Sequence, residues 1–303
     1  MLALLFPGQG SQTPGMLTPW LNDETQKLIA TWSLHIDLDL ARLGTTATAE
    51  EIKDTANAQP LIVAAGLLGA EALKLSKFAV VAGHSVGEIT AAGVAGIISP
   101  AHALELVRQR GIAMAKAASQ VETGMAAVLG GDRQEVLNAI KSFELVPAND
   151  NGAGQIVAAG SLDALDKLIE NPPAGARVRS LAVAGAFHTY FMQSAVSHVA
   201  AQVEKVSIKE PISQLLSNKD GSVVNGGKDA IDRIVNQIAN PVRWDLCMES
   251  LVQLGITGAI EFPPAGTLVG LLKRATPAIE TFALKSPADL AAAKEFAIKH
   301  GGA

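Results

Sequence analysis

Residues 79–89 read AVVAGHSVGEI, and this stretch is the strongest indication of the fold. Its first residues are small and apolar, as in a buried strand, and an Ala-rich segment typical of a helix follows it. Between the two, Gly83 and Gly87 flank Ser85 in the pattern G-x-S-x-G. In a nucleophile elbow, this pattern places a serine on a tight turn between a strand and a helix. The stretch therefore predicts a strand–turn–helix unit with Ser85 as a candidate nucleophile.

Short apolar runs and longer Ala-rich segments alternate along much of the chain. The runs 2–6, 78–82 and 257–262 predict buried strands, and the segments 60–75 and 99–119 predict helices. Alternation of this kind is typical of an α/β fold with a mostly parallel sheet.

The middle of the chain follows another pattern. Between residues 124 and 186, apolar runs and amphipathic segments come in the order strand, helix, strand, strand, helix, strand. This is the order of the ferredoxin-like split unit. We therefore expect a small subdomain that is inserted into a larger α/β body.

The composition excludes several classes of protein. Of the 303 residues, 49% are hydrophobic and 17% are charged, which excludes a disordered chain. The net charge of −5 is unfavourable for general binding to nucleic acid or to an anionic membrane. One cysteine, Cys247, gives no disulfide framework and no C-x-x-C metal motif. Because neither a basic signal sequence nor a membrane-length apolar run is visible, we expect a soluble, cytoplasmic protein.

A nucleophilic serine requires a base, and the chain has six histidines. His188 follows the small-residue run 181–187, which would leave a strand end close to the reactive edge of a sheet. A core histidine with satisfied hydrogen bonds is a competing interpretation for His188. It is the better interpretation for the other five, which are His35, His84, His102, His198 and His300.

The loop 6–12, FPGQGSQ, follows the first predicted strand. Its two glycines allow a close backbone approach, and backbone N–H groups are well suited to stabilise an oxyanion. A dinucleotide-binding fingerprint is the rival interpretation, but it would require glycine where Thr13 stands. A P-loop is excluded because its pattern does not occur.

Arg110 stands on an apolar face of a predicted helix that begins at Ser99-Pro100. Winding the segment at about 100° per residue brings apolar side chains to one face, with Arg110 in its middle. A buried arginine requires an anionic partner. That partner is either a structural carboxylate, which is the simpler answer, or the carboxylate of a substrate.

Seven segments together resemble the malonyl-CoA:acyl carrier protein transacylase family of dissociated fatty-acid synthesis, in its actinobacterial form. They are residues 3–15 (ALLFPGQGSQTPG), 82–89 (AGHSVGEI), 123–131 (TGMAAVLGG), 154–160 (GQIVAAG), 183–192 (VAGAFHTYFM), 240–247 (NPVRWDLC) and 261–266 (EFPPAG). Each motif alone is weak, but their order and spacing match from end to end. The resemblance implies an α/β-hydrolase-like parallel-sheet body, residues 1–123 and 187–303, with a small ferredoxin-like subdomain inserted at 124–186.

The resemblance also implies roles for the candidate residues. Ser85 would be the nucleophile and His188 the base of a Ser–His dyad. Arg110, which lies 25 residues after the serine, would bind the free carboxylate of malonate. Phe187 completes the Ala-Phe-His motif of malonyl-accepting relatives and would line the substrate site.

Further roles follow from the same resemblance. The backbone N–H groups of Gln9 and Val86 would form the oxyanion hole, and the main-chain carbonyl of Gln237 would orient the histidine. Arg177 and Arg179 would contribute to docking of the carrier protein, although a solvated strand edge explains them equally well.

The implied reaction transfers malonyl from malonyl-CoA to the phosphopantetheine thiol of acyl carrier protein, by a ping-pong mechanism that supplies fatty-acid elongation. No metal and no other cofactor is implied. We expect a monomer whose partners are acyl carrier protein and malonyl-CoA or CoA, without nucleic acid or membrane. The alternatives are a malonate decarboxylase subunit, a trans-acting polyketide acyltransferase, a serine hydrolase and a noncatalytic binding module. Arg110 argues against a lipase, whose pocket should be apolar.

Overall fold

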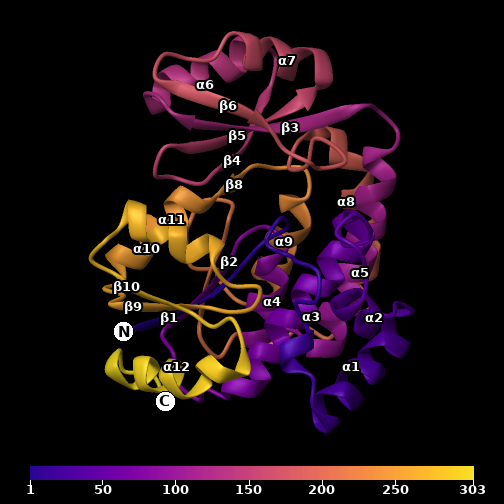
Figure 1. Cartoon of the computed structure of the whole chain (residues 1–303), viewed down its shortest axis with the longest axis vertical. Coiled ribbons are helices and arrows are strands. Elements are labelled where there is room, and N and C mark those ends of the chain that lie inside the picture. The colour runs from indigo at the N-terminus through magenta and orange to yellow at the C-terminus, as the bar shows by residue number, and fades with distance from the viewer.

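A parallel five-stranded sheet forms the centre of the larger part of the molecule (Figure 1). The computed structural model describes all 303 residues. The strand order is β10-β9-β1-β2-β7, so that the first strand of the chain lies in the middle. The strands are β1 (Leu2–Phe6), β2 (Val80–Gly83), β7 (Gln214–Leu216), β9 (Gly258–Glu261) and β10 (Glu280–Ala283). The predicted α/β class with a parallel body sheet is confirmed.

Both faces of this body sheet are covered by helices, as a parallel sheet requires. Alternate residues of β1 belong to different cores: Leu4 and Phe6 pack on one face, and Ala3 and Leu5 on the other. The second face is covered by α10 (Trp244–Gln253) and α11 (Thr267–Ala275). The remaining body helices are α1 (Asp23–Ile36), α2 (Leu40–Thr45), α3 (Thr55–Leu73), α4 (Gly87–Val94), α5 (Pro100–Ala118), α8 (Gln193–Val203), α9 (Gly227–Gln237) and α12 (Leu290–Lys299), with short 3-10 turns at Thr18–Trp20, Glu51–Lys53, Tyr190–Met192 and Pro287–Asp289.

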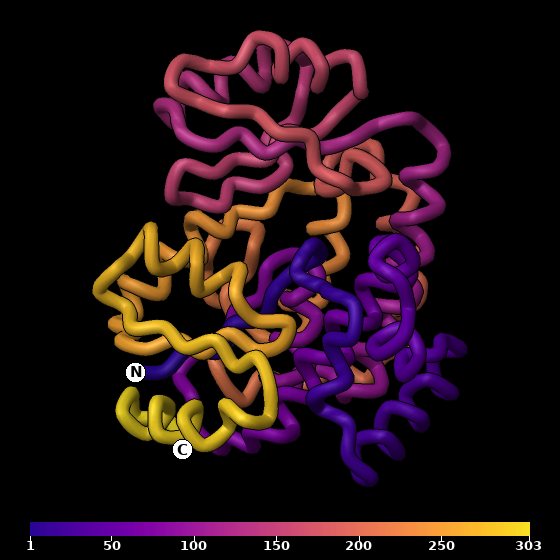
Figure 2. The backbone as a smooth tube through the Cα atoms, viewed as in Figure 1, coloured from indigo at the N-terminus to yellow at the C-terminus, as the bar shows by residue number.

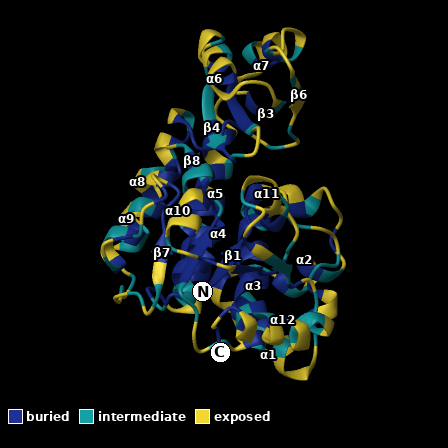
Figure 3. Ribbon diagram, turned by 90° about the vertical axis from the view of Figure 1, so that its left-hand side faces the viewer, coloured by how far each residue is buried: buried dark blue, intermediate teal, exposed yellow.

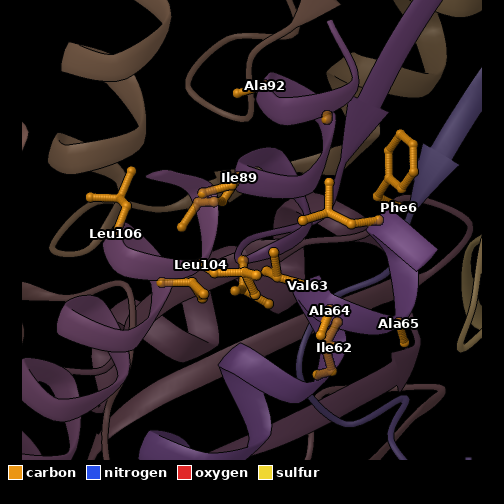
Figure 4. Packing of buried hydrophobic residues seen from close by; sticks show 14 of the residues in the cluster. Phe6, Ile62, Val63, Ala64, Ala65, Ile89, Ala92, Leu104 and Leu106 are labelled. Carbon is orange, nitrogen blue, oxygen red and sulfur yellow. The ribbon is translucent and has the colours of Figure 1, made fainter. Parts of the chain in front are cut away.

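Helix α3 is the core helix of the body. It is long and apolar enough to cross a membrane, but 72% of its most apolar window is buried inside the chain. A Cβ atom added at Gly66 would lie 2.7 Å from Cγ2 of Thr90, so this glycine lets α3 pack closely against α4. Figure 4 shows this packing through Phe6 of β1, Ile62, Val63, Ala64 and Ala65 of α3, Ile89 and Ala92 of α4, and Leu104 and Leu106 of α5.

The small sheet stands above the body and has α6 (Arg133–Ser142) and α7 (Leu162–Glu170) on its outer face (Figure 1). Its order is β6-β3-β5-β4-β8, and its first four strands show the ferredoxin-like arrangement that the sequence predicts. The strands are β3 (Thr123–Gly130), β4 (Val146–Asp150), β5 (Gln155–Ser161), β6 (Ala176–Ser180) and β8 (Val242–Arg243).

The two sheets are joined by the chain in both directions. The backbone enters the small sheet after α5 and returns through residues 181–192 to α8 (Figure 2). Strand β8, from the C-terminal part of the chain, pairs in parallel with β4. Because β8 lies outside residues 124–186, the predicted division at these boundaries stays a prediction.

The small sheet has two different faces. Ala126 and Val128 of β3 pack with α6 and α7 in a small core, whereas Met125 and Val157 belong to the core of the body. Figure 3 shows buried residues concentrated around β1, α3 and α4, with exposed residues on the outer helices. His84, directly after β2, hydrogen-bonds to Asn151, directly after β4, so the body side of the small sheet lies toward the carboxyl ends of the body strands, where α/β proteins place their ligands.

Candidate active site

Ser85 occupies a strained turn between β2 and α4. Its φ is 52°, in the left-handed region that is costly for a residue with a side chain. A Cβ at Gly83 would lie 2.0 Å from the carbonyl carbon of Gly87, and one at Gly87 would lie 2.1 Å from the oxygen of Phe6. The turn therefore requires both glycines of the G-x-S-x-G pattern. The Ser85 N–H donates to Oδ1 of Asn218 at 2.7 Å, and Asn218 lies just after β7, so a residue at the end of a neighbouring strand fixes the turn.

His188 is the histidine that the fold brings to this serine. Its Nε2 lies 2.7 Å from Oγ of Ser85, and its Nδ1 lies 2.8 Å from the main-chain oxygen of Gln237. A carbonyl oxygen can only accept, so Nδ1 carries the proton and Nε2 is free to accept one from the serine. Burial, and then the charge of Arg110, lower the pKa of His188 to about 3. The imidazole is therefore neutral at neutral pH.

Arg110 is 1% exposed and lies beside the same serine. Its Nη2 is 3.4 Å from Oγ of Ser85 and 3.0 Å from Oε1 of Gln237, and its Nη1 donates to Oε1 of Gln59 at 2.7 Å. Burial lowers the pKa of Arg110 only to about 10, so the guanidinium is charged at neutral pH. Arg110 forms none of the salt bridges of the chain. The two oxygens that accept from it, apart from the serine, belong to neutral amides, which leaves its charge available to an anionic ligand.

The backbone N–H groups of Gln9 and Val86, close to the serine, have no acceptor within the chain. Gln9 lies in the loop after β1, and Val86 directly precedes α4. The two loops are in contact, because the His84 N–H donates to the oxygen of Phe6 at 2.9 Å and a Cβ at Gly8 would lie 2.7 Å from the His84 oxygen. Both N–H groups are therefore free to donate to a ligand, and their role as the oxyanion pair stays a prediction.

Three further residues complete the site, and the sequence analysis did not identify them. Gln59, in the first turns of α3, accepts from Arg110. Asn218 follows β7, and its side chain bridges the Ser85 N–H and the oxygen of Gly83. Glu88 accepts from the Asn218 N–H at 2.7 Å and from Nε2 of Gln237. Glu88 adjoins the elbow motif, which was the one available signal, whereas the contacts of Gln59 and Asn218 form only in the folded chain.

The other residues singled out in the sequence do not contact Ser85 through a hydrogen bond. Phe187 precedes His188 and is buried in the core of the body. Arg177 and Arg179 are exposed on β6, the edge strand of the small sheet, and they hydrogen-bond to no residue of the site. The side chain of His84 is turned to Oδ1 of Asn151 at 2.8 Å, as expected for a histidine that does not serve the nucleophile. No group of three or more His, Cys, Asp or Glu residues that could hold a metal ion is present.

Comparison with known proteins places the chain among acyltransferases. The family model described as acyl transferase domain matches residues 3–288. The malonyl CoA-acyl carrier protein transacylase of Mycobacterium tuberculosis (strain ATCC 25618 / H37Rv) is 55% identical over 296 residues, which cover 96% of this chain and 98% of that protein. The chain belongs to the malonyl CoA-acyl carrier protein transacylase family.

Solved structures of this transacylase family have the same fold. The crystal structure of MCAT from Mycobacterium tuberculosis superposes with a TM-score of 0.92 at 54% identity, covering 95% of this chain and 98% of that one. A malonyl-transacylase in complex with a type II PKS acyl-carrier protein also gives a TM-score of 0.92, at 30% identity, covering 97% of this chain and 99% of that one. The resemblance found in the sequence is thereby confirmed.

Proposed function

We propose that this chain transfers the malonyl group of malonyl-CoA to the phosphopantetheine thiol of acyl carrier protein, through a malonyl ester on Ser85. One observation carries the proposal: the Ser85 hydroxyl lies between the Nε2 of His188 and the guanidinium of Arg110. A base and a cation that meet at one hydroxyl suit an acyl group that bears a carboxylate. The names of the relatives, and the carrier protein bound to one of them, support this substrate and this acceptor.

In the first half-reaction, Oγ of Ser85 attacks the thioester carbonyl carbon and its proton passes to Nε2 of His188. The carbonyl oxygen becomes an oxyanion, which accepts hydrogen bonds from the N–H groups of Gln9 and Val86. The carbon–sulfur bond then breaks, and the CoA sulfur takes the proton from His188. The products are CoA and malonyl-Ser85.

The second half-reaction uses the same groups in the opposite direction. The carrier thiol gives its proton to Nε2 of His188, and its sulfur attacks the ester carbonyl of malonyl-Ser85. The ester bond breaks, Oγ of Ser85 regains the proton from His188, and malonyl is left on the carrier. Each step uses only groups of this chain and the two thiols, so the proposed reaction requires no metal or other cofactor.

Arg110 accounts for the preference for malonyl. Malonyl has one methylene between its carboxylate and the reacting carbonyl, so a cation that binds the carboxylate must lie close to the nucleophile. Nη2 of Arg110 lies 3.4 Å from Oγ of Ser85, which satisfies this requirement. A guanidinium can also bind a carboxylate through two parallel hydrogen bonds, which lysine cannot reproduce.

The carrier protein is proposed to dock against the small sheet near β6. Arg179 is paired with Ala127 and Arg177 with Leu129, so both arginines stand on the sheet face opposite α6 and α7. This is the face that packs on the body, where Ser85 lies. A basic patch here would attract an acidic partner, although the chain as a whole carries a net charge of −5.

The experiment that tests this function compares acceptors. Purified protein is incubated with malonyl-CoA, with and without holo-acyl carrier protein, and the malonyl products are followed by mass spectrometry. We expect malonyl carrier protein to form, and free malonate to form far more slowly. Rapid release of malonate without transfer would identify a hydrolase and would contradict the proposal.

A further inference from the structure

Gln237 contacts all three central residues of the site. Its main-chain oxygen accepts from Nδ1 of His188 at 2.8 Å, and its side-chain Oε1 accepts from Nη2 of Arg110 at 3.0 Å. Its Nε2 donates to the main-chain oxygen of Ser85 at 3.3 Å. The orientation of one buried amide therefore determines whether Arg110 faces an acceptor or a donor.

Glu88 determines this orientation. The carboxyl oxygens of Glu88 face N–H donors on both sides: Oε1 accepts from the Asn218 N–H at 2.7 Å, and Oε2 accepts from Nε2 of Gln237. Burial raises the pKa of Glu88 to about 8, whereas the Asn218 N–H, the charge of Arg110 and the Gln237 amide favour its ionised form. Neither carboxyl oxygen faces an acceptor, so both accept from N–H groups in this arrangement. Because both carboxyl oxygens accept here, the amide nitrogen of Gln237 faces Glu88, and its oxygen faces Arg110.

Asn218 strengthens the same orientation. Its Nδ2 donates to the oxygen of Gly83 at 2.8 Å, so its Oδ1 is held toward the Ser85 N–H and Nε2 of Gln237. Three acceptors thus face the Gln237 amide nitrogen: the Ser85 oxygen, Oδ1 of Asn218 and Oε2 of Glu88. With Glu88 only 1% exposed, no bulk water can replace its carboxylate in this role.

We infer that Glu88 is a positioning residue for substrate selection, which acts through the Gln237 amide to keep an acceptor on Arg110 and hold its guanidinium beside Ser85. Glu88 contacts neither the substrate nor the reacting atoms. A reversed amide would set an NH2 group against Nη2 of Arg110, and the guanidinium would lose this contact and its place. The bond to His188 would survive, because it comes from the main chain of Gln237. The inference rests on the proposed malonyl transfer.

The test measures acylation of the Glu88→Gln variant by malonyl-CoA and by acetyl-CoA. The new amide has almost the same shape, but with its oxygen on the Asn218 N–H its NH2 group faces the Gln237 amide nitrogen and opposes the wild-type orientation of that amide. We expect kcat/KM for malonyl-CoA to fall by about 10- to 100-fold, the range for one hydrogen bond to a charged group. Acetyl-CoA has no carboxylate for Arg110, so its kcat/KM should change by less than about threefold. Equal losses for both substrates, or an unchanged ratio, would overturn the inference.

Glu261→Gln is the matched control. Glu261 is also a fully buried carboxylate at a strand end, but it accepts from the N–H groups of Gly266, Leu268 and Val269 and has no hydrogen bond to Gln237. This variant should lose thermal stability and keep the wild-type ratio of malonyl to acetyl acylation. A change in this ratio equal to that of Glu88→Gln would mean that any buried carboxylate has the effect.

A second variant covers the case in which Glu88→Gln does not fold. Gln237→Met removes the amide and keeps the main-chain carbonyl that accepts from His188, so the same loss of malonyl preference is expected. A wild-type ratio in this variant would overturn the inference. The wild-type protein is measured first: if it forms no malonyl-Ser85, the proposed function itself fails, which is distinct from an unchanged ratio in an active enzyme.

Discussion

Nη2 of Arg110 lies 3.4 Å from Oγ of Ser85, although the two residues are 25 positions apart and stand on different elements. Arg110 belongs to α5, and Ser85 precedes α4. The contact places a charged group that forms no salt bridge directly beside the nucleophile. It also contributes to the low pKa of His188, because the positive charge of Arg110 opposes protonation of the imidazole.

Replacing Arg110 by alanine should change which acyl group is transferred. Removing one partner of a buried, hydrogen-bonded charge pair costs about 2–5 kcal/mol. At about 1.4 kcal/mol per factor of ten, malonyl transfer should fall by roughly 30- to several-thousand-fold. Acetyl transfer should fall far less, because acetyl has no carboxylate. Steady-state kinetics with both CoA esters checks this ratio, and equal losses would show that Arg110 is structural.

The acid limb of the pH–rate profile, which is the fall of the acylation rate at low pH, should depend on the charge at position 110. His188 must be neutral to act as a base, and its pKa is about 3, so acylation should not decline near the pH of an ordinary histidine. Arg110→Gln removes a cause of the low pKa and should move the acid limb, measured with acetyl-CoA, to higher pH. Arg110→Lys keeps the charge and serves as the control. Identical limbs in both variants would contradict the prediction.

Protein stability should fall in acid partly because of His188. The pKa of this histidine is about 3 when folded and about 6.5 when unfolded, so the folded state binds fewer protons between these values. The stability that the neutral, buried imidazole contributes is present above pH 6.5 and is lost as the pH falls from 6.5 toward 3. Between pH 7 and pH 5 this loss amounts to about 2 kcal/mol.

Urea unfolding of the wild type and of His188→Gln at these two pH values measures this contribution. The variant should lose about 2 kcal/mol less than the wild type over the interval. Burial also lowers the pKa of His84, but His84 is present in both proteins and cancels in the difference. The same pH dependence in both proteins would refute the assignment.

Reversing the charges of Arg177 and Arg179 to glutamate should weaken docking of the carrier protein. Two exposed ion pairs, each of about 0.2–1 kcal/mol, correspond to a KM for the carrier that rises roughly 2- to 30-fold. Acylation by malonyl-CoA should be unaffected. The same reversal at Lys141 and Lys167, exposed on α6 and α7 on the other face of the small sheet, is the control. If both pairs act alike, the carrier does not recognise β6.

The fold could be predicted where local patterns determine it. The strand–turn–helix around Ser85 and the strand and helix order of the small sheet are local, and both are present in the structure. Strands β7 and β8 have three and two residues, too few to show a period, and β8 joins the small sheet from far along the chain.

The site was predictable to a different extent. The apolar face of the helix at Ser99-Pro100 pointed to a buried Arg110, but the partners of its guanidinium could not be read from the sequence. Gln59 and Gln237 are 51 and 127 residues away from it, and polar residues at such separations carry no spacing signal. The contact of Asn218 with Ser85 could not be predicted for the same reason, because 133 residues separate them.

The central claim is that malonyl is transferred through Ser85, and the intact mass of the protein after incubation with malonyl-CoA tests it most directly. We predict that the wild type gains the mass of one malonyl group, that peptide mapping places it on Ser85, and that Ser85→Ala gains none. Addition of holo-acyl carrier protein should remove the malonyl group from the wild type and leave it on the carrier thiol. An adduct on another residue, or transfer by Ser85→Ala, would contradict the account.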